Sequence, residues 1–305
     1  MEKTLSLSIA ILVIAVIALG IGVASYVKTP AETGVAITET GTGTQAAESE
    51  GPPYTGTSNG FVIKFENGKV FYLSGDTCLF SDMKWVMGDY YKPDVAFLPI
   101  GNVFTMDPRD AAFATTWINP KYVVPYHYKI FPFLTQTPDE FVRLVNERRT
   151  RGETRTEPIA LEPGVEREIE GVKVTWLGHG SFFIVSPTGT GIIIDPWFTP
   201  NPETPAKFKD MSIFGKVDLL LITHGHLDHF DYDNMKKIIE LYNPVILSQW
   251  EVMGFLQDKV PGKFMMMNKG GRITKGVIEK QGFTLNIPES IEITMVQAEH
   301  SSSGP

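Results

Sequence analysis

The pattern of apolar and polar positions divides the chain into three parts. Residues 4–27 carry no charged side chain and are rich in Leu, Ile, Val and Ala. A helix of about 24 residues, at ~1.5 Å per residue, is long enough to cross ~30 Å of hydrocarbon. Residues 28–58 are rich in Thr, Gly, Ala, Ser, Glu and Pro, which is typical of a flexible linker. We therefore expect a transmembrane anchor over 4–27, a linker over 28–58 and one domain over 59–305.

The apolar segment has one alternative interpretation, a cleaved secretory signal. Gly22-Val23-Ala24 offers a cleavage site of small residues, but the apolar run is long for a signal. Lys3 and the amino terminus precede the run, which favours an amino terminus inside and the remainder outside. Both interpretations predict a domain outside the cytoplasm, and the first makes the membrane a partner of the N-terminal helix.

From residue 60 onward, short apolar runs alternate with helical patterns. Asn67-Gly68 between two apolar runs predicts a β-hairpin, because both turn positions need φ > 0. Asp107 before Pro108 predicts a helix N-cap, and Thr137–Glu140 predicts a capping box. The mixture predicts an α/β domain in which helices cover sheets. The expected elements are strands over 61–65, 70–73, 95–98, 122–124, 172–177, 181–185, 191–194 and 217–223, and a helix over 233–242.

Composition argues against a nucleic-acid partner and against sites built from cysteine. The chain has 35 acidic and 27 basic residues, a net charge of −8 and a pI near 5.3. An acidic chain is poorly suited to binding phosphate backbones, so no nucleic-acid partner is expected. The single cysteine, Cys78, excludes both an intrachain disulfide and a Cys-rich zinc site.

Three of the six histidines and one aspartate lie within six residues, directly after the apolar run 217–223. A loop that leaves the carboxyl end of a strand can turn several side chains toward one point. Neutral imidazoles and carboxylates are good ligands for zinc and similar divalent ions. The set exceeds what a single structural zinc ion needs, so it predicts two neighbouring metal ions. Its members are His224, His226, Asp228 and His229.

The pattern His-x-His-x-Asp-His after an apolar strand resembles the signature of the metallo-β-lactamase superfamily. Five other segments resemble motifs of the branch that contains ascorbate-6-phosphate lactonase. They are the opening strand at Val174–Gly180, the aspartate of Ile194–Trp197, the histidine of Ala298–Ser302, the aspartate of Gly75–Thr77 and the histidine of Pro125–Tyr128. The resemblance covers about residues 60–304 and implies a four-layer αββα sandwich.

The order of these motifs differs from that of the family. In the family the opening strand comes first, whereas here the motifs around Asp76 and His127 precede it. The cyclic order is unchanged, so the chain resembles a circular permutant. Residues 59–170 resemble the C-terminal half of the family, and residues 171–305 resemble its N-terminal half. Such a rearrangement is physically permissible because chain termini are often close together at domain surfaces.

The resemblance also implies roles for individual residues. One metal would be held by His224, His226 and His300, a second by Asp228, His229 and His127, and both would be bridged by Asp76. Asp195 and His179 would support these ligands, and Asp228 would also orient the nucleophile. The implied reaction is attack by a metal-bridging hydroxide on an ester, lactone or phosphodiester of a small molecule. Zinc is the first expectation, with manganese or iron as alternatives.

Two other functions are compatible with the same motif. One is an iron-dependent oxidoreductase similar to sulfur dioxygenases, on the same fold. The other is a metal-binding scaffold without catalysis. The complete set of ligand types favours an enzyme over a scaffold. The flavo-di-iron group has Glu where this chain has His226, which counts against membership of that iron-dependent group.

Overall fold

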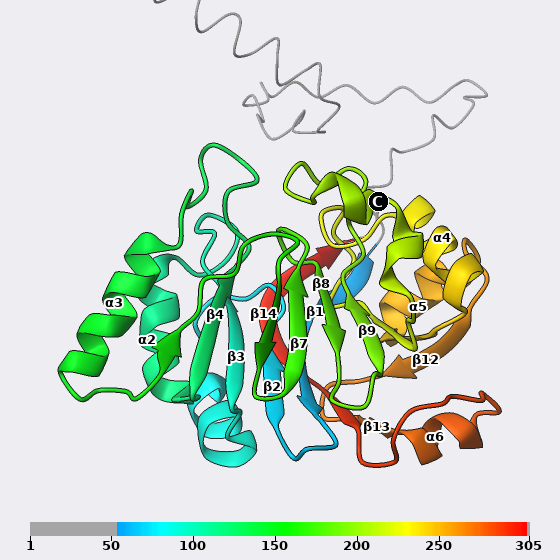
Figure 1. The fold of residues 1–305 in the computed structure, drawn as a ribbon, viewed down its shortest axis with the longest axis horizontal. Helices are drawn as coiled ribbons and strands as arrows, with labels where there is room; N and C mark the ends of the chain where they lie inside the picture. Colours follow the sequence, from blue (N-terminus) through cyan, green and yellow to red (C-terminus); the bar gives the residue numbers. More distant parts are fainter. Residues whose placement is uncertain (1–53, 304–305) are drawn as a thin grey trace, which may run out of the picture. The chain divides into compact units, whose positions relative to one another are not determined.

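Two seven-stranded sheets organise residues 54–303, the part of the chain that this computed structural model describes (Figure 1). The first sheet has the order β13-β14-β1-β2-β3-β4-β5, and the second has the order β12-β11-β10-β9-β8-β7-β6. The strands of the first sheet are β1 (Tyr54–Lys64), β2 (Val70–Leu73), β3 (Val95–Pro99), β4 (Tyr122–Tyr126), β5 (Glu157–Pro158), β13 (Arg272–Thr274) and β14 (Glu292–Ser303). The strands of the second sheet are β6 (Glu166–Ile169), β7 (Val172–Trp176), β8 (Phe182–Val185), β9 (Gly191–Ile194), β10 (Leu219–Leu221), β11 (Val245–Gln249) and β12 (Lys263–Met267).

The helices lie on the outer sides of the two sheets. In Figure 1, α2 and α3 lie beside β3 and β4, whereas α4 and α5 lie at the right of the view, beside β9 and β12. The helices are η1 (Met83–Tyr91, a π-helix), α2 (Pro108–Ile118), α3 (Asp139–Thr150), the short 3₁₀ helices η2 (Ala206–Lys209) and η3 (Met211–Phe214), α4 (Tyr232–Tyr242), α5 (Trp250–Leu256) and α6 (Lys275–Lys280).

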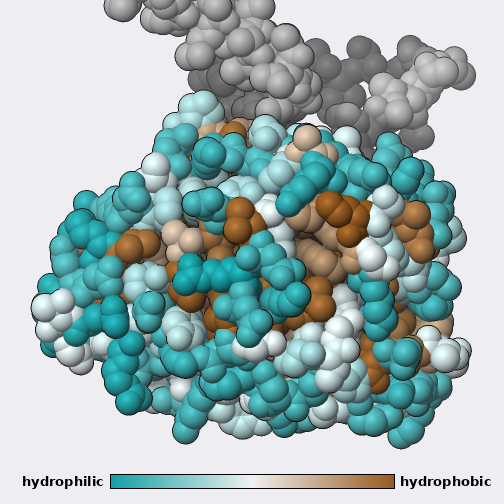
Figure 2. Space-filling view, viewed as in Figure 1, coloured by the Kyte–Doolittle hydropathy of each residue, from teal (hydrophilic) through white to brown (hydrophobic). Residues whose placement is uncertain are grey.

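The main core lies between the sheets. The ring of Phe182 on β8 lies 5.2 Å from that of Phe97 on β3 and 5.6 Å from that of Tyr126 on β4, so the two sheets pack face to face. A second cluster packs α4 and α5 onto the second sheet and includes Ile238 and Leu220. The face of the molecule seen in Figure 1 is mostly hydrophilic, with hydrophobic residues grouped near its middle (Figure 2). The prediction of an α/β domain with two sheets is therefore confirmed.

Several local predictions can be compared directly with the structure. The predicted hairpin is present, since β1 and β2 pair antiparallel on either side of Asn67-Gly68. Asp107 caps α2, because its carboxylate accepts hydrogen bonds from the backbone N–H groups of Arg109 and Asp110. The predicted capping box is wrong. Pro138 occupies the N-cap of α3 with no side-chain cap, and the Thr137 hydroxyl donates to the Asp139 carboxylate instead.

The membrane part of the prediction requires correction. Among residues 54–303, no helix combines the length and the apolarity needed to cross a bilayer. The longest helix described, α3, has 12 residues and spans about 18 Å, against ~30 Å of hydrocarbon. The predicted anchor over 4–27 lies outside the described residues. The anchor, the membrane partner and the extracytoplasmic placement thus find no support and are withdrawn. The predicted linker over 28–58 also ends too late, because β1 begins at Tyr54.

Candidate metal centre

The strand directions bring the predicted site residues to one edge of the sheets. β2, β3 and β4 run parallel in the first sheet, as do β9, β10, β11 and β12 in the second, so their carboxyl ends meet at common edges. Loops at the carboxyl ends of strands are a frequent place for binding sites in α/β proteins. Asp76 follows β2, His127 follows β4, His179 follows β7, Asp195 follows β9, the loop from His224 to His229 follows β10, and His300 lies in β14.

One group of three imidazoles forms between β10 and β14. His224 Nε2 lies 3.0 Å from His226 Nδ1, and His300 Nε2 lies 3.3 Å from the same atom. One ring nitrogen from each residue lies within 4.8 Å of the others. His224 is fully buried, and the other two are half-buried. The group is thus open on one side.

Thr223 fixes the proton of His224. The Thr223 hydroxyl has a single proton, which it donates to Asp195 Oδ2 at 2.7 Å. The same hydroxyl oxygen lies 3.0 Å from His224 Nδ1 and has no second proton to donate, so it accepts a hydrogen bond from Nδ1. The imidazole proton of His224 is therefore on Nδ1. His224 Nε2 therefore presents a lone pair to the centre of the group, which is the state that binds a metal.

A second group forms around the carboxylate of Asp76. Its Oδ2 lies 2.8 Å from His127 Nε2, 3.1 Å from His229 Nε2 and 4.0 Å from His224 Nε2. On its other ring nitrogen, His229 contacts Asp195 Oδ2 at 2.8 Å. Asp76 thus lies next to imidazoles of both groups, and Asp195 connects Thr223 to His229.

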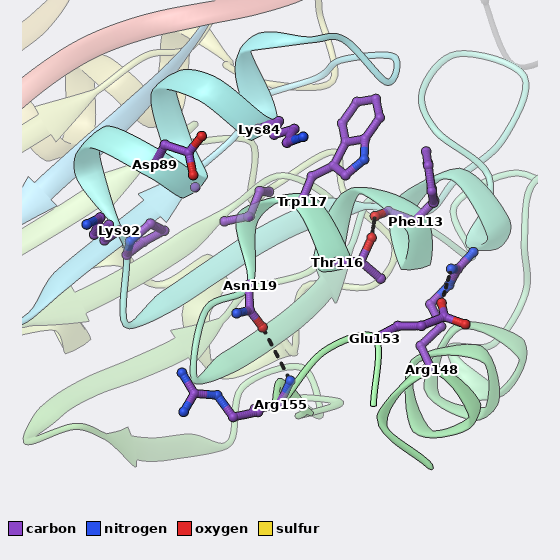
Figure 3. Close-up of a pocket in the computed structure, with 13 residues that line it drawn as sticks. Lys84, Asp89, Lys92, Phe113, Thr116, Trp117, Asn119, Arg148, Glu153 and Arg155 are labelled. Carbon is purple, nitrogen blue, oxygen red and sulfur yellow. Dashed lines mark hydrogen bonds and ion pairs between the residues drawn. The ribbon is translucent and has the colours of Figure 1, made fainter. Parts of the chain in front are cut away.

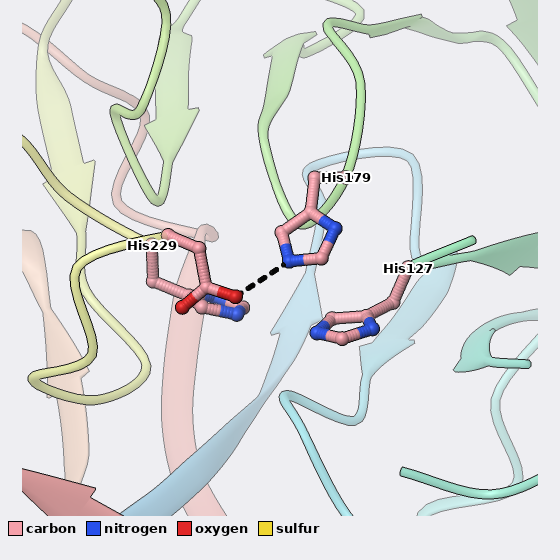
Figure 4. A group of neighbouring side chains, drawn as sticks. His127, His179 and His229 are labelled. Carbon is pink, nitrogen blue, oxygen red and sulfur yellow. Dashed lines mark hydrogen bonds and ion pairs between the residues drawn. The ribbon is translucent and has the colours of Figure 1, made fainter. Parts of the chain in front are cut away.

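His179 adds a further imidazole to this second group (Figure 4). Its Nε2 lies 2.9 Å from Asp228 Oδ2, and its ring centroid lies 3.8 Å from that of His127. Ligand atoms of His127, His179, Asp228 and His229 all lie within 4.8 Å of one another. The sequence predicted only a supporting place for His179, whereas the structure brings one of its ring nitrogens as close to the group as those of the predicted ligands.

The electrostatics separate the two groups. Burial, together with the neighbouring imidazoles, lowers the pKa of His226 to about 4 and holds the pKa of His224 well below its usual value. The three-imidazole group is therefore neutral at pH 7. At His229, burial opposes the charged form, but the carboxylates of Asp76 and Asp195 outweigh it and hold the pKa well above its usual value. The second group thus carries positive charge on His229 between two carboxylates.

The residues present fit a divalent cation. Asp76 Oδ1 and both ring nitrogens of His127 are buried, and among the described residues none of these atoms has a hydrogen-bond partner of acceptable geometry. Buried polar atoms are nearly always paired, so unpaired ones need an explanation. Neutral imidazoles and carboxylates are the ligands that zinc, manganese and iron accept. A cation between these atoms would satisfy them and would replace the proton that joins His229 to Asp76.

The backbone is strained at three of these positions. His127, His179 and Asp195 have φ of +60°, +52° and +48°, in the left-handed region that non-glycine residues rarely adopt. Each such residue costs ~1–3 kcal/mol and persists only where the surroundings enforce it. One enforcing contact is a backbone hydrogen bond from His127 N–H to the His179 carbonyl at 3.3 Å. Strain concentrated on these residues indicates that their side-chain directions are constrained by the site.

A separate pocket of about 740 Å³ lies away from this centre, beside η1 and α2 (Figure 3). Its basic side chains include Lys84, Lys92, Arg148 and Arg155. Lys92 is the C-cap of η1, and Arg148 lies in the last turn of α3 and pairs with Glu153 at 2.7 Å. Cations near the carboxyl ends of helices offset the partial negative charge there. The charges of Lys92 and Arg148 are therefore accounted for by the helix ends, and we assign the pocket no ligand.

Comparisons with known proteins agree with the motifs. Two family models, each described as a β-lactamase superfamily domain, match residues 173–302 and 20–128. A UPF0173 metal-dependent hydrolase of Chloroflexus aurantiacus is 50% identical over 109 residues, which are 36% of this chain and 43% of that protein. A metal-dependent hydrolase of the same description from Caldivirga maquilingensis is 56% identical over 89 residues, 29% of this chain and 38% of that protein.

Among solved structures, the metallo hydrolase Igni18 of Ignicoccus hospitalis matches 32% of this chain and 40% of its own, with 39% identity and a TM-score of 0.28. The match to this chain covers less than half the length of each of the two curated relatives, 43% for the Chloroflexus protein and 38% for the Caldivirga protein. Two family models of the same superfamily nevertheless match the two parts of this chain, and the residues that carry the signature converge at one sheet edge. The chain therefore belongs to the metallo-β-lactamase superfamily.

Proposed function

We propose that this protein is a metal-dependent hydrolase that cleaves an ester, lactone or phosphodiester bond in a small molecule. The observation that carries the proposal is the convergence of imidazoles and carboxylates from six separate segments at one edge. The relatives described as metal-dependent hydrolases support it. Divalent cations at this place would supply Lewis acidity and activate a water molecule as the nucleophile.

Each side chain has a distinct role in this proposal. His224, His226 and His300 would hold one cation, His127, Asp228 and His229 would hold the other, and Asp76 would serve as a shared carboxylate. Asp195 keeps His229 and, through Thr223, His224 in the orientation that directs a lone pair to the cations. Ligands held in this way by outer hydrogen bonds bind metal more tightly.

Asp228 and His179 are proposed to act together on the nucleophile. His179 Nε2 contacts Asp228 Oδ2 at 2.9 Å, which leaves Oδ1 free to accept a hydrogen bond from a water molecule and so to orient it. The carboxylate of Asp228 is about a quarter exposed, so water can reach it. Burial, with the neighbouring imidazole of His127, lowers the pKa of His179 to about 4, so this residue stays neutral at pH 7 and donates a single ring proton. His179 thus positions Asp228.

Metal titration of the full chain tests the proposed site. The wild type is expected to bind about two zinc ions per chain and to hydrolyse at least one of 4-nitrophenyl acetate, γ-butyrolactone and bis(4-nitrophenyl) phosphate. His226→Ala should bind about one ion, because it removes one ligand of a three-imidazole group. Thr284→Ala, at an exposed loop position, serves as the control and should behave as the wild type. A folded wild type that binds no zinc, manganese or iron would overturn the proposal.

We also infer that the chain order is a circular permutation of the family order. β14 and β1 are antiparallel neighbours, with Ser303 opposite Tyr54, so a short loop can join these two positions. The separate family-model matches on either side of residues 129–172 support two exchanged halves. The boundary expected at 170/171 falls in the tight turn between β6 and β7, where Glu170 and Gly171 both have positive φ.

A rearranged chain tests this inference. Residues 165–303 are placed directly after residues 1–53, a short Gly/Ser loop joins 303 to 54, and the chain ends at 164. The new ends fall between β5 and β6, where Gly164 is buried and Val165 and Glu166 are exposed. We expect the rearranged protein to fold and to bind the same number of zinc ions as the natural order, measured by circular dichroism and metal analysis. An insoluble or metal-free product, beside a wild type that binds metal, would contradict the permutation.

A further inference from the structure

Two loops beside the candidate metal centre form one structural unit. Loop 100–107 follows β3 and loop 127–136 follows β4, and because these strands are parallel neighbours both loops leave the same edge of the first sheet. Their backbones are joined by a hydrogen bond from Thr135 N–H to the Gly101 carbonyl, 3.0 Å long. The second loop begins at His127 itself, a proposed ligand.

The first loop packs directly against that ligand. A Cβ added at Gly101 would lie 2.2 Å from the carbonyl oxygen of His127 and 2.8 Å from its Nδ1. Only glycine permits so close an approach of the two backbones. The bases of the two loops are therefore fixed beside the metal centre, at His127 and Gly101.

The two loops display apolar side chains, which we call the aromatic rim: Val103, Phe104, Phe131 and Phe133. Val103, Phe104 and Phe133 are 61%, 47% and 59% exposed. The ring of Phe133 lies 6.0 Å from that of Phe104 and 5.4 Å from that of Phe131, to which it is parallel within 3°. Leu227, between two proposed ligands in the sequence, is also 64% exposed.

The side chains of the aromatic rim do not gain the free energy that burial gives to apolar groups, so their exposure points to a function. Grouped exposed apolar side chains generally mark a binding surface. Val103 moreover has φ of +55°, a conformation that β-branched residues rarely adopt. Strained residues of this kind cluster at binding and active sites.

Charge decides which ligand the rim suits. Residues 100–106 and 130–136 contain no charged side chain. Lys129, which directly precedes the second range, is paired with Glu203 on the loop after β9, with its Nζ 2.6 Å from Glu203 Oε2. The two loops thus offer no free cation for a sugar phosphate or another polyanion, and they offer rings and aliphatic carbon to an apolar chain.

We propose that the aromatic rim binds the acyl chain of the substrate, so that the bond cleaved is the ester or lactone of a medium-chain or long-chain carboxylic acid. Hydrolysis adds water across the acyl C–O bond, which releases the acid and the alcohol from an ester and gives one hydroxy acid from a lactone. This inference rests on the proposed function, because the metal centre positions the carbonyl while the rim holds the chain.

Binding of alkyl hydroxamates to the zinc-loaded full chain tests this inference without requiring turnover. Acetohydroxamate and octanohydroxamate have the same metal-binding head and differ only in chain length, and their Kd values are measured by calorimetry. We expect the octanoyl compound to bind at least about tenfold more tightly, because each buried methylene adds affinity. The double variant Phe104→Ser/Phe133→Ser should reduce this ratio to about threefold or less and leave the Kd of acetohydroxamate unchanged. Phe113→Ser, on α2, is the matched control and should keep the full ratio.

The outcomes distinguish the two proposals. A wild type that binds no zinc refutes the proposed function, and with it the acyl-chain site. Zinc binding with equal Kd values for both hydroxamates, or with a ratio that the double variant retains, overturns only the acyl-chain site. Light scattering gives a further arm. If the wild type is an oligomer that the double variant dissociates, the rim is an interface between copies, which also overturns the inference.

Discussion

Asp76→Asn is expected to reduce zinc binding to about one ion or fewer per chain and to lower hydrolysis at least about 10³-fold. Among residues 54–303, Asp76 is the one carboxylate that contacts imidazoles of both groups. An amide keeps its shape but loses the negative charge that attracts the cations. A metal Lewis acid supplies several kcal/mol of transition-state stabilisation, and each ~1.4 kcal/mol is a factor of ten in rate.

The measurements are metal content after dialysis and initial rates on the substrate that the wild type hydrolyses. Asp258→Asn, the same substitution at an exposed turn position, should leave both unchanged. Near-ultraviolet circular dichroism shows whether the variant keeps its tertiary packing. Two bound ions and a wild-type rate in Asp76→Asn would remove Asp76 from the proposed site.

Gly75→Ala is expected to lower the free energy of unfolding by about 2–5 kcal/mol. Gly75 has φ of +65°, and a Cβ there would lie 2.0 Å from the carbonyl oxygen of Asn59 on the neighbouring strand. The left-handed conformation costs an alanine ~1–2 kcal/mol, and forcing a methyl group into a packed region costs ~1–3 kcal/mol more. Because Gly75 precedes Asp76, the displaced backbone should also weaken metal binding.

Gly68→Ala separates these two costs. Gly68 also has positive φ, of +80°, but a Cβ there meets no atom within 4 Å. Its expected cost is only the ~1–2 kcal/mol of the backbone conformation. Urea denaturation of both variants measures the difference, and equal losses at the two glycines would show that the contact with Asn59 is relieved by a small shift.

Short-range signals predicted much of the local structure. Asn67-Gly68 predicted a hairpin, and Asp107 before Pro108 predicted an N-cap, because each depends on a few adjacent residues. The capping box at Thr137 failed because its hydroxyl found a nearer partner in Asp139. The strand β14, with 12 residues, was missed, because a segment that crosses a sheet beside a distant strand carries little local signal.

The sequence alone determined the chemistry of the site, since the spacing of His224, His226, Asp228 and His229 after an apolar strand already implied a metal-binding loop and a family. Only the tertiary structure decided the partners of that loop. Asp76 meets His229 across 153 positions of sequence, because parallel strands in two facing sheets end at the same edge. The close approach of His179 to Asp228 and the contact between the exposed rings of Phe104 and Phe133 likewise depend on which loops become neighbours. Strand pairing over long separations sets those neighbours, whereas sequence spacing encodes only contacts within one segment.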